Sequence, residues 1–219
     1  MNKIFNYMMF LNILIGLCVY NLIEHQLSLK CNKKNKVFNH LSGIHIFLVF
    51  IINTLNLCYP ENNLFLNMVK VNSGGYFVNH GLAIIKHKKK NLFYSTILIH
   101  HLLCIGNILY MPRNSYGSLV LIVAEISNLP GYFIYDYLQS DTKNSKTVCK
   151  IYACKQVQII VYSIIRLIAL PYLTYLEYFI QKNYVYSSFY KFSYLMHVMG
   201  FVYSGILFKN LYSIKNKYD

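Results

Sequence analysis

Polar side chains suited to proton transfer lie in the middle of two long apolar stretches of this chain. His100 and His101 lie in the first stretch, Glu125 and Asn128 lie in the second, and a short turn at residues 111–117 joins the two. Ionisable groups are strongly disfavoured in hydrocarbon, and within a membrane span they usually face a bundle interior or a wet cavity. Histidine is an effective base near neutral pH, and a nearby carboxylate can hold it in one tautomer. The pattern therefore predicts a polar site between two neighbouring helices.

The same residues also fit a structural role. A hydrogen bond between a histidine and Glu125 can simply hold two helices together. Adjacent histidines on a helix point about 100° apart, so only one of the pair is expected to face a given partner. Glu125 and Asn128 are three residues apart and share a face. No metal site is predicted, because His100, His101 and Glu125 would need a further ligand group opposite them, and nothing in the sequence marks one.

The composition favours a membrane protein. Of the 219 residues, 56% are hydrophobic and only 13% are charged, whereas a soluble domain carries about a quarter charged residues. The net charge of +14 does not indicate nucleic-acid binding, because the lysines fall in the gaps between apolar runs, where they act as a topology signal. The six cysteines have neither zinc-type spacing nor the pattern of a disulfide framework.

Seven apolar segments approach or exceed the length of about 20 residues that a bilayer requires. They are residues 4–23, 38–59, 64–85, 92–111, 118–138, 151–180 and 184–208. The predicted fold class is therefore all-α, a polytopic protein with seven transmembrane helices. Pro171 predicts a kink or tilt in the sixth. The first segment is interpreted as an uncleaved span, because no small-residue cleavage site follows it.

The distribution of basic residues predicts the orientation. Fifteen of the 21 lie in the gaps and tail on one side, four lie on the other side, and Lys70 and Arg166 lie within spans. The positive-inside rule places the N-terminus in the lumen and the C-terminus in the cytosol. The chain then divides into an N-terminal helix with a basic loop (1–37), a six-helix membrane domain (38–208) and a short basic tail (209–219).

The polar groups within the spans fall between mid-membrane and the predicted cytosolic side, which suits a cavity entered from the cytosol. Two of the basic features carry alternatives. Arg166 is either an anchor for a lipid phosphate or carboxylate, or a structural ion pair, with Glu125 as the candidate partner. The lysine-rich run at residues 86–90 either binds anionic head groups or coenzyme A phosphates, or only sets the topology.

Four short motifs, in this order and spacing, resemble those of the TLC-domain family. They are Ser42 with His45; Gly75, Tyr76 and Phe77; the pair His100 and His101; and Arg166 with Pro171. The family includes ceramide synthases, translocating-chain-associating membrane proteins and small proteins linked to membrane lipid composition. The resemblance covers about residues 38–208, and it implies a bundle of the last six helices around a central cavity.

The resemblance also implies site residues. It makes His100, His101 and Glu125 the catalytic candidates, and the ligand-binding candidates are His45, Tyr76, His80, Asn128 and Arg166. Ceramide synthases follow the histidine pair with His-Asp-x-x-Asp. In this chain Glu125 and Asn128 take the places of the two aspartates, which is more similar to the family members that are not synthases.

The expected function is lipid homeostasis by binding or handling a membrane lipid or fatty-acyl chain, in the endoplasmic reticulum membrane or a connected endomembrane. One alternative is a ceramide synthase-like N-acyltransferase that uses acyl-coenzyme A as a substrate. Another is a membrane cargo receptor or chaperone. No cofactor and no nucleic-acid partner are expected.

Overall fold

The computed structural model describes residues 3–31, 33–87, 92–111, 116–139, 145–180 and 187–218, and within these ranges the chain is helical, without β-strands. The elements form seven rods, each coinciding with one predicted apolar segment. They are α1 (Lys3–Lys30); α2 (Lys34–Cys58); α3 (Asn63–Val69) with η1 (Lys70–Gly74) and α4 (Gly75–His87); α5 (Leu92–Leu109); α6 (Tyr116–Ile126) with α7 (Leu129–Gln139); α8 (Ser145–Ser163) with η2 (Ile164–Ala169), α9 (Leu170–Tyr175) and η3 (Leu176–Ile180); and α10 (Ser187–Tyr218).

Four helices in the described ranges are long and apolar enough to cross a membrane. They are Phe10–Lys30, Lys36–Cys58, Tyr116–Tyr135 and Val148–Phe179. Tyr94–Leu109 is an apolar helix of shorter length. The all-helical class is thus confirmed, and length and apolarity support a membrane-spanning role for four of the seven rods.

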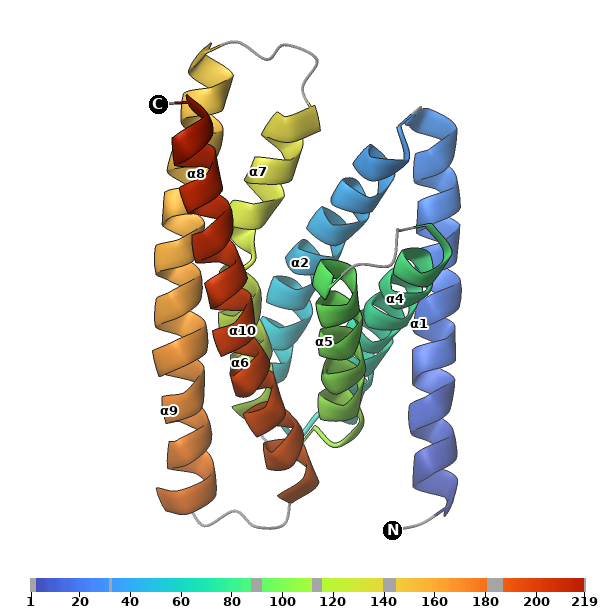
Figure 1. Ribbon diagram of the computed structural model, residues 1–219. Coiled ribbons are helices and arrows are strands. Elements are labelled where there is room, and N and C mark those ends of the chain that lie inside the picture. The colour runs from blue at the N-terminus through green and yellow to red at the C-terminus, as the bar shows by residue number, and fades with distance from the viewer. Residues whose placement is uncertain are drawn as a thin grey trace.

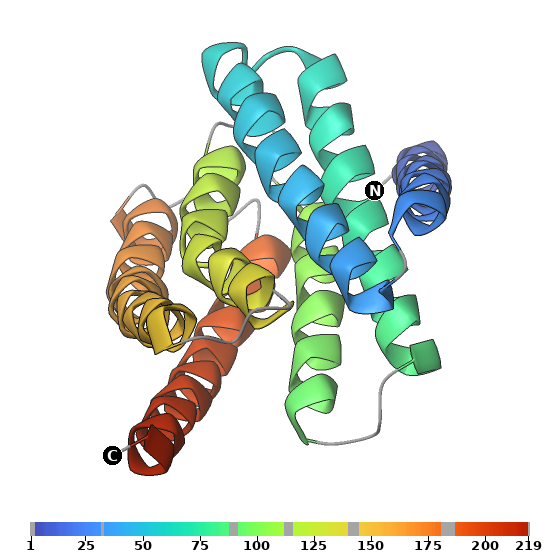
Figure 2. The same cartoon turned by 90° about the horizontal axis from the view of Figure 1, so that it is seen from above.

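The rods run up and down in two groups (Figure 1). In the first group α1 packs on η1 and α4, and α2 and α5 complete it; in the second, α7 packs on α8, and α10 packs on α8 and α9. Contacts of α2 with α6 and α7, and of α10 with α5, join the groups. Seen along the bundle, α1 lies at the edge, beside α4 (Figure 2).

Polar groups are buried and apolar groups face outward. Asn53, Asn56, Ser73, Ser118 and Ser127 have no exposed surface. Large apolar side chains are more than 40% exposed on every rod, among them Phe10, Phe47, Leu82, Ile99, Phe133, Ile160 and Phe201. In hydrocarbon such apolar exposure is favourable, and a buried polar group can hydrogen-bond inside the bundle, as Asn56 Nδ2 does to Ser118 Oγ at 2.8 Å.

Two glycines let α1 approach the third rod closely. A Cβ on Gly16 would overlap the carbonyl oxygen of Val71, and a Cβ on Gly75 would overlap the backbone of Gly16. The contact is flanked by a hydrogen bond from Asn12 Nδ2 to Asn67 Oδ1 at 3.2 Å. The N-terminal helix, expected to lie outside the site domain, is therefore packed closely against one of that domain's rods.

Both basic residues predicted within spans lie in π-helical turns. Buried Lys70 begins η1, and buried Arg166 lies in η2. In η2 the Leu170 N–H donates to the Ile165 carbonyl, five residues earlier. The sequence predicts a kink or tilt at Pro171; the structure has wider, π-helical turns on both sides of this proline. Such turns are frequent at functional sites.

Candidate functional site

A cavity of about 210 Å³ lies within the bundle, between the two groups of helices. All eight residues predicted as catalytic or ligand-binding line it: His45, Tyr76, His80, His100, His101, Glu125, Asn128 and Arg166. On α2 the lining residues fall between 39 and 46, on α5 between 96 and 101, and on α10 between 199 and 203. The stretches on α2 and α5 lie in the first half of each helix, which is the upper half in Figure 1, and the stretch on α10 lies at the middle of that helix.

His45 lines the cavity from α2, and its side chain is buried, with 1% of its surface exposed. Its ring stacks on that of Tyr76, with centroids 3.8 Å apart and an interplanar angle of 7°. His45 Nδ1 lies 3.2 Å from the Tyr20 hydroxyl, which donates its proton to Asn72 Oδ1 at 2.6 Å. Because that hydroxyl has only one proton, Nδ1 must be the donor to it, and this network assigns the lone pair of neutral His45 to Nε2.

Glu125 faces His45. Its Oε1 lies 3.8 Å from His45 Nε2, and its Oε2 accepts a hydrogen bond from Asn128 Nδ2 at 3.0 Å. The shared face expected for Glu125 and Asn128 is therefore present. The distance to His45 is too long for a hydrogen bond, but it allows an ion pair when His45 is protonated. Glu125 was expected to orient a member of the histidine pair; in the described chain it contacts His45 instead.

The histidine pair diverges, as the helical geometry predicts. His101 Nε2 lies 2.8 Å from His80 Nδ1, so one ring donates and the other accepts. His101 Nδ1 is buried with no hydrogen-bond partner in the described chain. The His100 ring lies beside Cys104, with Nε2 3.5 Å from the sulfur. The cavity therefore holds two histidine contacts, His80 with His101 and His45 with Glu125, and the Tyr76 ring stacks on both His45 and His80 between them.

A break between α6 and α7 exposes a carbonyl to Arg166. Pro130 has no N–H to donate within the helix, and the Asn128 N–H donates to Glu125 O rather than to Ala124 O. The freed Ala124 carbonyl accepts from Ser127 Oγ at 2.6 Å and from an Arg166 guanidinium nitrogen at 3.2 Å.

Arg166 binds to two residues at this break, Ala124 and Ser127. Its Nε also donates to Ser127 Oγ at 3.0 Å, and the guanidinium carbon lies 5.5 Å from the Tyr162 ring centroid. Among the described residues no ion pair joins it to Glu125. The predicted Arg166–Glu125 pair is therefore replaced by bonds to a hydroxyl and a main-chain oxygen, which hold the broken helix beside the cavity.

Other polar residues lining the cavity were not singled out from the sequence. They are Asn39, Thr96, Tyr132, Tyr135, Gln158, Tyr162 and Tyr203. The chain contains 22 tyrosines, so tyrosine position carried no signal. Tyr20 was missed as well, because it lies on the helix assigned outside the site domain.

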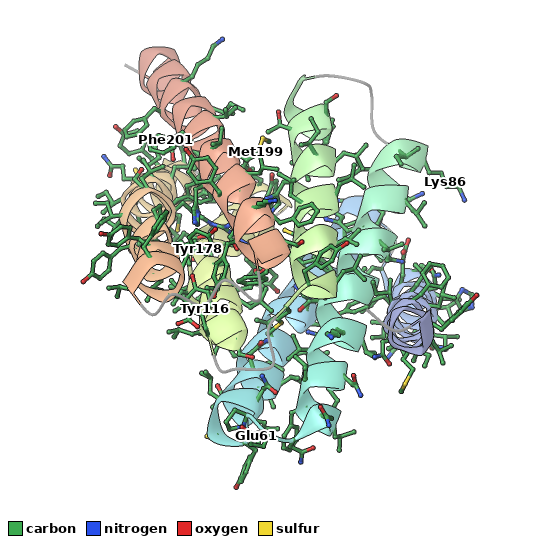
Figure 3. The ribbon with its side chains drawn as sticks, turned by 90° about the horizontal axis from the view of Figure 1, so that it is seen from below. Glu61, Lys86, Tyr116, Tyr178, Met199 and Phe201 are labelled. Carbon is green, nitrogen blue, oxygen red and sulfur yellow. The ribbon has the colours of Figure 1, made fainter. Side chains whose placement is uncertain are left out.

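Lys86 is exposed and points away from the bundle (Figure 3). Lys88, Lys89 and Lys90 lie outside the described residues, so head-group binding by this run stays a prediction. Across the described ranges, no group of three His, Cys, Asp or Glu side chains is placed to hold a metal ion.

No protein-family model matches the sequence, and comparisons with curated proteins and with solved structures gave no match. The resemblance to TLC-domain proteins therefore rests on the four motifs alone.

Proposed function

We propose that this chain is a seven-span membrane protein of the TLC type that takes part in lipid homeostasis. Its cavity binds a membrane lipid or a fatty-acyl chain. The observation that carries the proposal is the cavity itself, which gathers eight polar residues from five different spans inside a bundle with an apolar exterior. An amphiphile suits such a site, because its polar group can bond to the wall while its chain lies against Ile46, Phe77 and Met199.

The proposed membrane is the endoplasmic reticulum or a connected endomembrane, with the N-terminus in the lumen and the C-terminus in the cytosol. The basic residues support this orientation. The cavity then lies toward the cytosolic half of the bundle.

Filling the cavity tests the proposal. Met199 lines it, whereas Phe201 is 60% exposed, and the two project from opposite sides of α10 (Figure 3). We expect native mass spectrometry to find lipid retained by the wild type and by Phe201→Trp, and lost from Met199→Trp. Equal retention by both variants would refute binding in the cavity.

The contact between His45 and Glu125 supports a second candidate, an acyl-coenzyme A-dependent N-acyltransferase. In that reaction an amine attacks the thioester carbonyl, a C–N bond forms, the C–S bond breaks and coenzyme A leaves as the thiol. A base removes the amine proton. His45 lines the cavity, and in the tautomer that the Tyr20 network assigns its lone pair is on Nε2, so His45 is the candidate for such a base.

Asn128 stands where the synthases have an aspartate, and this difference separates the lipid-binding candidate from the acyltransferase candidate. Asn128 donates to Glu125. An aspartate at 128 would not recreate the synthase arrangement, because Glu125 is one methylene longer than the aspartate of the synthases and its carboxylate would be misplaced. We expect neither the wild type nor Asn128→Asp to transfer an acyl group from labelled acyl-coenzyme A to a sphingoid base in nanodiscs. Turnover that His45→Ala abolishes would establish the acyltransferase instead.

A further inference from the structure

A second cavity of about 100 Å³ lies between α7, α8 and α10. It shares Gly131, Tyr135, Gln158 and Tyr203 with the main cavity. The two hollows therefore adjoin, and together they are called the groove. The residues found only in the second part include Leu138, at the end of α7, and Leu207, late in α10. The groove thus runs from the main cavity toward the upper end of the bundle in Figure 1.

Gly131 and Gln158 lie where the two parts meet, and their close packing requires a glycine at 131. A Cβ at Gly131 would lie 2.8 Å from Gln158 Nε2. A larger residue at 131 would therefore displace the Gln158 side chain within the groove.

Lys155 lies on the wall of the second cavity, one helical turn before Gln158. It is partly buried, among Ile134, Leu138, Ile159 and Leu207. In the described part of the chain it has no hydrogen bond, ion pair or ring contact. Lys150 on the same helix differs, because it is exposed and its ammonium lies 5.6 Å from the Tyr137 ring centroid. A partly desolvated cation without a partner favours an anion beside it.

We infer that Lys155 binds the anionic head, phosphate or carboxylate, of a single-chain amphiphile whose chain passes Gly131 into the main cavity. The inference rests on the proposed lipid binding and adds the class of lipid. The apolar side chains around Lys155 fit the first part of the chain, and the ammonium fits the charge of the head.

The test measures binding to the full chain in neutral phosphatidylcholine nanodiscs. The probes are oleoyl lysophosphatidate, oleate, monooleoylglycerol and inorganic phosphate. We expect Lys155→Gln to weaken the binding of lysophosphatidate or oleate at least tenfold, and Lys155→Arg to keep it. Monooleoylglycerol, which has no charge, should bind equally well to all variants. Lys150→Gln is the matched control and should bind as the wild type does.

Three results would overturn the inference. One is unchanged binding of the anionic probes by Lys155→Gln, and another is an equal loss of monooleoylglycerol. The third is inorganic phosphate binding as tightly as lysophosphatidate, which would mean a site for free phosphate. If the proposed lipid binding itself is wrong, none of the three oleoyl probes binds to the wild type. That result is distinct from the three above.

Discussion

Glu125 and His45 meet in the cavity although they lie on helices far apart in the sequence. The sequence predicted that Glu125 would serve a histidine, and it placed His45 among the ligand-binding residues. It did not predict their contact, because helical periodicity defines which residues share a face but not which helix lies opposite. The hydrogen bonds of His101 to His80, and of Arg166 to Ser127 and Ala124, were not predicted for the same reason.

A double-mutant cycle tests the contact. His45→Leu leaves the buried Glu125 carboxylate facing an apolar group, which we expect to lower the free energy of unfolding by roughly 1–3 kcal/mol. Adding Glu125→Leu should recover part of this loss, with a coupling of about 0.5–3 kcal/mol. The measurement is thermal or denaturant unfolding in detergent.

His101→Leu combined with Glu125→Leu is the control cycle. Its effects should be nearly additive, because His101 bonds to His80. Coupling in this cycle and additivity in the first would contradict the observed arrangement.

At the scale of elements, the positions of the seven rods were predictable from apolar segments, and their ends agree within a few residues except at the edges of the long first, sixth and seventh rods. The break after Ile126 and the π-helical turns were not predicted, because hydropathy does not respond to single hydrogen-bond shifts. The role of α1 was also missed. Its Tyr20 is 1% exposed and bonds to His45, so the first helix shapes the site.

Docking of α1 should depend on Gly16. We expect Gly16→Ala to lower the stability by about 1–3 kcal/mol, because the added methyl overlaps main-chain atoms that cannot rotate away. Gly205→Ala is the control, since a Cβ there meets nothing within 4 Å. Thermal unfolding of the two variants gives the comparison, and equal midpoints would show that the close approach is not required.

At the scale of the whole molecule, the segments richest in lysine connect helices at one end. The end of α1, the beginning of α2, the end of α7, the beginning of α8 and the C-terminal end of α10 all lie at the upper side of Figure 1, opposite the N-terminus. A chain of seven helices joined by short connections reverses direction at each connection, so alternate connections lie at the same end, and the orientation inferred from charge stays a prediction.

Cysteine labelling tests the proposed orientation. In a background without the six native cysteines, we expect Lys33→Cys to react with an impermeant reagent from the cytosolic side of sealed microsomes. Glu61→Cys, at the opposite end, should react only after permeabilisation. Both positions are exposed. Reaction of both from the same side would rule out a membrane crossing between them.

The most direct test of the central claim is to map where a lipid chain lies. The full chain in membranes is labelled with a fatty acid that carries a photoactivatable diazirine, and the crosslinked residues are identified by mass spectrometry. Tyr132 and Met199 line the cavity, whereas their neighbours Phe133 and Phe201 are exposed on the bundle exterior. Binding in the cavity predicts crosslinks at Tyr132 and Met199 that excess unlabelled fatty acid removes. Crosslinks confined to Phe133 and Phe201, unchanged by the competitor, would contradict it.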